Sequence, residues 1–278
     1  MGRWLANFLL QEGKEVVITG RNQRKLLDAK QQLGVETASN AEAVKRADVV
    51  LLSVPIDNFE SVVEEVAPYI RAEQSIIDIT SIKVFPVEAM HKHIKTGVVL
   101  GMHPMFGPGA KNITGQNFVL TPTDDGERAL AQRVEQYLVD RGARVSLMTP
   151  HQHDEMMAVI LGLSHFVAIV SADTLLSLDK FEMTRAISGT SFKVLLMLME
   201  SVISEDAEFY ASLQMSLPKM TEIEELFQRS SKTWANIVQN KDRPEFIKRM
   251  NILKARFKEG NPDFGKAYDT MYRVLDQL

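Results

Sequence analysis

The chain has 278 residues, of which 45% are hydrophobic and 24% charged, and this composition is typical of a folded globular protein of one or two domains. Its net charge of −4 argues against a nucleic-acid-binding protein, and the sequence has no block of basic residues with interleaved aromatic residues. The absence of cysteine excludes thiol catalysis, disulfides and thiolate metal sites, and we predict no metal site.

The longest apolar run, residues 156–170, bears on whether the chain enters a membrane. Gly162, Ser164 and His165 interrupt it, and it is shorter than a bilayer requires. No cleavable signal peptide precedes it. We therefore expect a soluble, cytoplasmic protein with no membrane partner.

The first two elements predict the second half of a β-α-β unit. Residues 1–11 place Leu5, Phe8 and Leu9 on one helical face, and residues 14–19 (KEVVIT) are an apolar strand. In the dinucleotide-binding version of this unit, the first strand ends in G-x-G-x-x-G and the third glycine begins the helix. Gly2 occupies that third position, so we expect the preceding strand and the first two glycines to be absent from this sequence.

Strands and helices then alternate as in a doubly wound (Rossmann-like) α/β domain. The expected helices are residues 23–33, 41–46 (capped by Asn40), 59–70 and 125–141, and the expected strands are residues 35–38, 47–54, 74–79, 97–101, 117–121 and 143–148. Continuous apolar strands of this kind indicate a parallel sheet that is covered on both faces.

From residue 151 the periodicity is almost wholly helical, and we place the domain boundary just before it. The prediction is a dinucleotide-binding domain over residues 1–149 and an all-α domain over residues 150–278. The run over residues 156–178 is apolar on nearly all sides, which indicates burial inside the helical domain or at a subunit interface.

The end of the second strand indicates which dinucleotide binds. An NAD site places an acidic residue there for the ribose hydroxyl, whereas a 2′-phosphate requires arginine. This chain has Arg21 and Asn22, followed by Arg24, and we therefore expect NADP in preference to NAD. The expected cofactor-binding residues are Gly2, Arg21, Asn22, Arg24, Val54 and Pro55.

A histidine at the end of a central strand is the first candidate for catalysis. His103 lies in LGMHPMFGPG, between an apolar run and a Gly/Pro-rich loop, where open α/β sheets present side chains to ligands. Ser81 and Lys83 follow the preceding strand in DITSIK and reach the same crevice if the two strands are neighbours. Taken singly, Ser81 is more simply a helix cap and Lys83 a surface charge.

In these segments the chain resembles the prephenate dehydrogenases of tyrosine biosynthesis. The resemblance covers MGRWLANFL, DITSIK, LGMHPMFGPG, HQHDEMMAVILGLSHFVAIV and SGTSFKVLLMLM, in that order. It implies a nucleotide-binding domain followed by a helical domain that forms a homodimer. It also implies hydride transfer from prephenate to NAD(P)+ with loss of CO2, giving 4-hydroxyphenylpyruvate.

The same resemblance assigns roles to individual residues. It implies that His103 accepts the substrate's hydroxyl proton, with Ser81 and Lys83 close by. It places His165 on the substrate side and puts Lys193 where the family usually has an arginine that binds a substrate carboxylate, a task that Arg185 could share. Lysine supplies the charge but lacks the bidentate fork of arginine.

Two other functions remain open. Arogenate dehydrogenase differs only in the side chain of its substrate. A non-catalytic nucleotide-binding or regulatory protein of the same fold is the second alternative, because the first strand is missing from the sequence. A related hydroxyacid or imine reductase is disfavoured, since such enzymes usually carry a catalytic lysine where this chain has His165.

Overall fold

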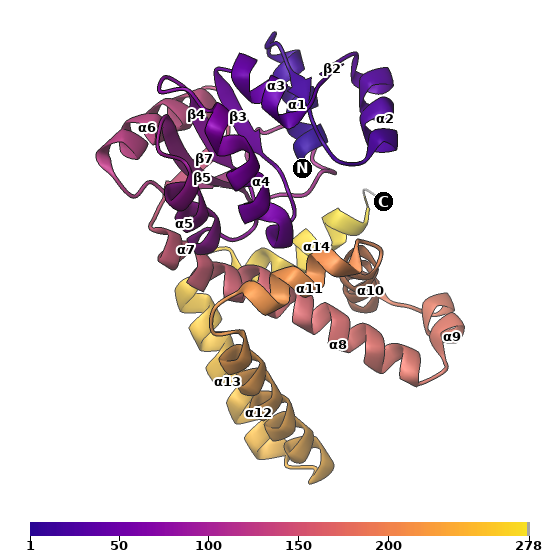
Figure 1. The fold of residues 1–278 in the computed structure, drawn as a ribbon. Coiled ribbons are helices and arrows are strands. Elements are labelled where there is room, and N and C mark those ends of the chain that lie inside the picture. Colours follow the sequence, from indigo (N-terminus) through magenta and orange to yellow (C-terminus); the bar gives the residue numbers. More distant parts are fainter. Residues whose placement is uncertain (277–278) are drawn as a thin grey trace. The chain divides into compact units, whose positions relative to one another are not determined.

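The computed structural model describes residues 1–276, and the chain divides into two compact units. Met1–Met157 form an α/β unit, and a helical unit begins at Ala158 (Figure 1). The first unit thus contains the predicted doubly wound domain together with one further helix, α7 (Pro150–Met157).

The main sheet of the first unit has five strands in the order β3-β4-β5-β6-β7. Their bounds are Val49–Leu52, Ser75–Asp78, Val98–Pro104, Asn117–Leu120 and Arg144–Leu147. The pairs β3–β4, β4–β5 and β6–β7 are parallel, but β5 and β6 are antiparallel. The expectation of a wholly parallel sheet is therefore wrong at one junction. Residues 105–116, which join β5 to β6, contain no helix, and an antiparallel pair needs no crossover helix.

Two short strands form a separate parallel pair, β1 (Val17–Ile18) with β2 (Glu36–Thr37). β3 is an edge strand of the five-stranded sheet.

Seven α-helices pack in this unit. They are α1 (Gly2–Gln11), α2 (Gln23–Leu33), α3 (Asn40–Arg46), α4 (Phe59–Val66), α5 (Val84–His93), α6 (Asp125–Val139) and α7. Asn40 is the first residue of α3 and does not cap it, contrary to expectation. Ser39 is the cap, because its side chain accepts from the Glu42 backbone N–H while the Glu42 carboxylate accepts from Ser39 in return.

Both faces of the sheet are covered, as the apolar strands predict. Successive residues of β4 and β5 contribute to different cores: Ile77 and Leu100 belong to a cluster that includes Leu5 of α1, and Ile76 and Val99 to a second cluster. Alternate side chains of a strand point to opposite faces, so helices pack against each face. This packing fixes the ends of β4 and β5, where the candidate site lies.

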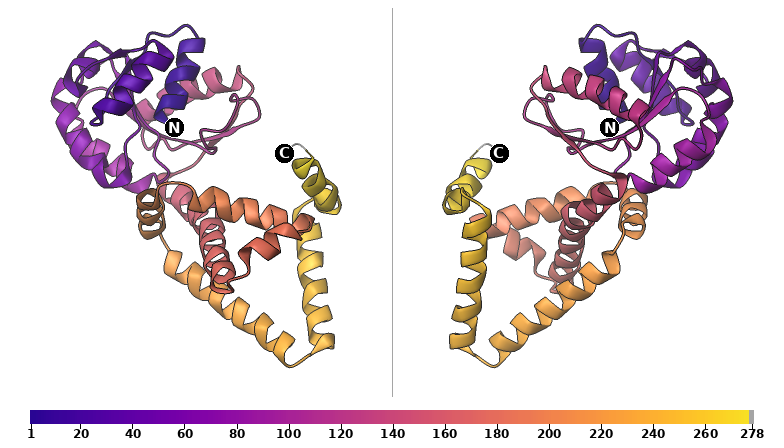
Figure 2. Two further views of the ribbon diagram at one scale, coloured as in Figure 1. Left: turned by 90° about the vertical axis from the view of Figure 1, so that its right-hand side faces the viewer. Right: turned by 90° about the vertical axis from the view of Figure 1, so that its left-hand side faces the viewer.

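The second unit is helical among its described residues. It begins with a π-helical segment, Ala158–Leu163, followed by α8 (Ser164–Ser177), α9 (Phe181–Ala186), α10 (Thr190–Ile203), α11 (Ala207–Ser216), α12 (Met220–Gln239), α13 (Arg243–Gly260) and α14 (Ala267–Leu275). α12 and α13 diverge from the turn that joins them, as Figure 2 shows.

One long helical segment, Pro150–Ser177, corrects the expectation that its apolar run is interrupted, and it bears on where that run is buried. Gly162, Ser164 and His165 do not interrupt it: it runs for 28 residues and is long and apolar enough to cross a membrane by length and composition. It is also not buried inside its own domain, because only 11% of its apolar window is buried and Ile160 is 50% exposed. The sequence correctly predicts that this helix is apolar. It does not predict whether other residues of the same chain pack over the apolar side chains.

Candidate active site

His103 lies within strand β5, although the sequence pattern places it after the strand. It pairs across the sheet with Val119 of β6, and 6% of its surface is exposed. β5 continues to Pro104 because the antiparallel β6 forms a ladder with residues 102–104. His103 is therefore held by the sheet, and the Gly/Pro-rich segment begins only beyond it.

A chain of buried polar side chains extends from His103 to the start of α5. His103 Nδ1 lies 2.9 Å from His153 Nε2, and His153 Nδ1 lies 2.6 Å from Asp154 Oδ1. Asp154 accepts two backbone hydrogen bonds, from the N–H of Lys83 to Oδ1 (2.7 Å) and from the N–H of Val84 to Oδ2 (2.9 Å). These are N–H groups at the beginning of α5, which have no partner within the helix. Asp154 of α7 thus satisfies them and fixes the histidine pair.

Lys83 is fully buried. The alternative interpretation of Lys83 as a surface charge is therefore wrong. Its ammonium forms an ion pair with Asp78, the last residue of β4, and donates to the Met102 carbonyl of β5 at 3.0 Å. Asp78 also accepts from the backbone N–H of Thr80 at 2.8 Å. Lys83 therefore joins the ends of two neighbouring strands directly beside His103.

Burial sets the protonation of these groups. Desolvation lowers the pKa of His103 well below its usual value of 6.5, and the neighbouring His153 and Lys83 lower it further. Burial also lowers the pKa of His153, although Asp154 opposes this effect. The pKa of Lys83 is lowered by burial against the raising effect of Asp78. His103 is accordingly neutral at neutral pH, as a proton acceptor must be.

Ser81 lies three residues beyond β4 and is half-buried. β4 and β5 are neighbours in register, with Asp78 opposite Gly101, so the condition for bringing Ser81 and Lys83 to the edge of the sheet near His103 is met. Ser81 is not the cap of α5, because that helix has Lys83 at its N-cap position.

Sequence reasoning missed three residues of this cluster: Asp78, His153 and Asp154. Their signal was present, since each is a polar side chain in a segment singled out for other reasons. Polar residues of a helix such as α7 normally face water, so the sequence pattern offered no reason to expect His153 and Asp154 in a buried site. His153 and Asp154 are instead 0% and 3% exposed.

Comparison with known protein families bears on this site. Residues 5–147 match the nucleotide-binding domain of prephenate dehydrogenase, and residues 149–252 match its dimerization domain. The chain belongs to the prephenate dehydrogenase family.

Curated relatives align with most of this chain. A probable arogenate/prephenate dehydrogenase of Methanocaldococcus jannaschii is 37% identical over 92% of this chain and 58% of its own length. The T-protein of Haemophilus influenzae is 27% identical over 84% of this chain and 61% of its own length. The chain thus spans about three fifths of the length of these relatives.

Solved structures of family members share the fold. Prephenate dehydrogenase from Aquifex aeolicus, in complex with hydroxyphenyl propionate and NAD+, superposes with a TM-score of 0.77 at 20% identity, covering 94% of this chain and 95% of that one. Synechocystis arogenate dehydrogenase gives a TM-score of 0.70 at 18% identity, covering 94% and 96%.

The expected cofactor-binding residues lie at the start of α1, between β1 and α2, on α2, and after β3. Gly2 packs so closely on the end of β3 that an added Cβ would lie 2.8 Å from Ser53 Oγ, which is the close helix-strand approach expected of the third glycine. Arg21 is exposed and donates to Asn58 Oδ1 at 2.5 Å, and Asn22 caps α2. Arg24 is exposed on α2. Val54 and Pro55 lie two and three residues beyond β3; Val54 is half-buried and Pro55 is exposed.

The helical unit carries the three expected substrate residues. His165, in α8, packs edge-on against the ring of Tyr210, with centroids 4.8 Å apart, and desolvation lowers its pKa. Its Nδ1 is buried with no hydrogen-bond partner within the described part of the chain. Arg185 in α9 and Lys193 in α10 are both exposed.

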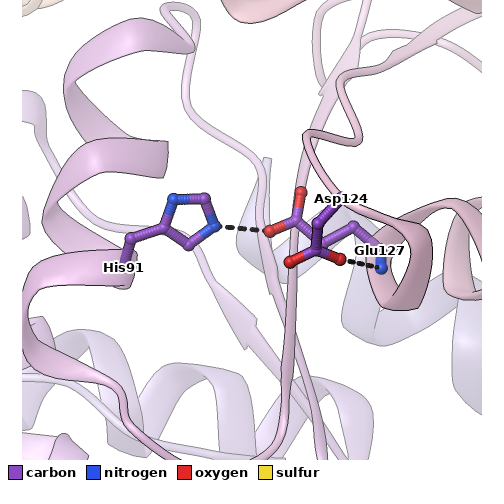
Figure 3. Close-up of side chains that lie close together, drawn as sticks. All are labelled: His91, Asp124 and Glu127. Atoms are coloured by element: carbon purple, nitrogen blue, oxygen red, sulfur yellow. Dashed lines mark hydrogen bonds and ion pairs between the residues drawn. The ribbon is translucent and has the colours of Figure 1, made fainter.

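A second cluster of ligand-type side chains lies elsewhere in the nucleotide-binding domain, where sequence analysis predicts no metal site. His91 Nε2 lies 2.5 Å from the buried Glu127 carboxylate, and Asp124 accepts from the backbone N–H of Glu127 at 2.8 Å (Figure 3). The three ligand atoms lie within 4.8 Å of one another. A helix cap on α6 and a hydrogen bond to His91 of α5 account for these contacts.

Proposed function

We propose that this protein catalyses the oxidative decarboxylation of prephenate to 4-hydroxyphenylpyruvate, with NADP+ as the hydride acceptor. The observation that carries the proposal is the buried His103 near the end of β5, hydrogen-bonded to His153, which in turn contacts Asp154. Membership of the family supports the reaction class.

His103 has the properties that the reaction demands. As hydride leaves the ring carbon that bears the hydroxyl group, the hydroxyl proton must be taken up, and a neutral imidazole can accept it. A bound nicotinamide supplies the hydride acceptor. We assign Ser81 to orienting the imidazole or the hydroxyl group. We assign Lys83 a positioning role, since its ammonium is committed to Asp78 and the Met102 carbonyl.

The residues at the start of α1 and after the end of β1 suit a dinucleotide. Gly2 packs too tightly against Ser53 to allow a side chain at the start of α1. Backbone N–H groups at the start of a helix attract phosphate. Arg21 and Arg24 supply positive charge near the end of β1, which favours a 2′-phosphate and hence NADP over NAD.

Prephenate carries two carboxylates, so its binding site needs cationic side chains to pair with them. We propose Lys193 and Arg185 for its carboxylates, with His165 as a further substrate residue. Lysine at position 193 lacks the bidentate fork of arginine, so the substrate would be held more weakly there.

The test is the rate of prephenate-dependent NADPH formation, followed by absorbance, for the wild type and His103→Asn. We expect the variant to lose at least about a hundredfold in kcat, the usual effect of removing a general base, while it still binds NADP. Near-normal turnover would exclude the proton-acceptor role.

Two further arms of that assay distinguish the alternatives. Replacing prephenate by arogenate tests the near variant, which the Methanocaldococcus relative's description includes. Replacing NADP+ by NAD+ tests the cofactor preference. Folded protein that is inactive with every substrate and cofactor combination would favour the non-catalytic alternative.

We also propose that the protein is a cytoplasmic homodimer formed through its helical unit. The matching family model is a dimerization domain, and large apolar side chains such as Ile187 and Met215 are 84% and 86% exposed in the single chain. Covering such surface is a common reason for stable association.

A further inference from the structure

We infer that His153 and Asp154 determine which nitrogen of His103 carries its proton, and that they do so through the backbone at the start of α5. The inference rests on the proposed function for its catalytic meaning. Its structural content, the position of one proton, can be measured without any substrate.

The direction of every hydrogen bond in the chain follows from its first members. The backbone N–H groups of Lys83 and Val84 can only donate, and each points at one oxygen of Asp154. The carboxylate is therefore held as an acceptor. At 2.6 Å, His153 Nδ1 must be the donor to Asp154 Oδ1.

The remaining protons are then determined in sequence. A neutral His153 with its proton on Nδ1 has an unprotonated Nε2, which accepts a hydrogen bond. The atom that faces it at 2.9 Å is His103 Nδ1, so this nitrogen carries the proton of His103. His103 Nε2 is left with a free lone pair, and this is the nitrogen available to take a proton from a substrate hydroxyl group.

The cluster is arranged to keep this tautomer. His103, His153 and Asp154 are 6%, 0% and 3% exposed, so water has little access to exchange hydrogen-bond partners. Lys83 contributes a fixed positive charge nearby, bound to Asp78, which disfavours a second proton on His103 before reaction. When His103 does accept a proton, His153 connects it to the Asp154 carboxylate.

Histidine ring nitrogens in the 15N-labelled protein report protonation directly through long-range 1H–15N correlation spectra. The His103 signals are identified by their loss in His103→Gln. We expect His103 to carry its proton on Nδ1 and to have an unprotonated Nε2 at neutral pH. A proton on Nε2 would overturn the inference, whatever reaction the protein catalyses.

Kinetic variants then test the catalytic consequence. His153→Phe removes the acceptor and should lower kcat by about a hundredfold or more with little change in KM, because an incorrect tautomer cannot act as the base. His153→Gln retains an oxygen that can accept from His103 and should recover part of the loss. Equal losses in the two variants would contradict the assigned role of the acceptor.

The exposed His151 on the same helix provides the matched control, and His151→Phe should retain wild-type turnover. If the spectra show the expected tautomer but wild type itself has no dehydrogenase activity, the proposed function fails and the inference about the proton stands. If activity is present and the proton lies on Nε2, the inference alone fails.

Discussion

At the scale of single residues, burial changes what the two site histidines contribute to stability. Free histidine has a pKa near 6.5, and burial lowers the pKa of both His103 and His153. Below about pH 6.5 the unfolded chain therefore binds protons that the folded chain does not. Protonation then favours the unfolded state.

We accordingly expect the free energy of unfolding to fall as the pH is lowered from about 7 to about 5, and to be fully recovered only above about 7.5. Urea unfolding at a series of pH values measures this dependence. His103→Gln removes one of the responsible groups and should show a shallower slope over the same range. A slope at least as steep in the variant would show that His103 is not a source of the effect.

At the scale of elements, Lys83 joins β4 to β5. Its buried ammonium pairs with Asp78 of β4 and donates to the Met102 carbonyl of β5. Removing one member of a buried ion pair leaves the other charge without compensation, which commonly costs about 3–5 kcal/mol.

Lys83→Met should therefore lower the free energy of unfolding by about 3–5 kcal/mol, measured by urea denaturation. Lys92→Met is the matched control, because Lys92 pairs with Glu60 at 2.8 Å but its side chain is 67% exposed. Exposed pairs contribute little to stability because water screens their charges. Similar small losses in the two variants would mean that Lys83 does not hold the strand ends together.

At the scale of the whole molecule, the helical unit leaves more apolar surface exposed than a monomer normally tolerates. Only 11% of the apolar window within Pro150–Ser177 is buried, and Met215 of α11 is 86% exposed. Two explanations are possible in physical terms, a second protein copy or a lipid bilayer.

Light scattering coupled to size-exclusion chromatography distinguishes them. We expect protein purified without detergent to have twice the mass of one chain at all practical concentrations. Monomeric mass would contradict the proposed homodimer, and a requirement for detergent would favour contact with a membrane.

The sequence by itself determined the fold class and most of the alternation of strands and helices, although it did not predict α5, and it singled out His103 as the catalytic candidate. It could do so because apolar periodicity depends on neighbouring residues, and because Gly/Pro-rich segments end strands locally. The edges of elements were less secure: Ser39, and not Asn40, caps α3, since both residues are good caps and only the reciprocal bond with Glu42 decides between them.

Tertiary structure alone decided what surrounds His103. His153 and Asp154 lie 50 and 51 residues further along the chain, and no local pattern relates such positions. The antiparallel β6 extends β5 through His103. Lys83, which follows β4, reaches the Met102 carbonyl of β5, next to His103. Local sequence governs the periodicity of each element, whereas burial, proton position and ion pairing depend on which elements the fold brings together.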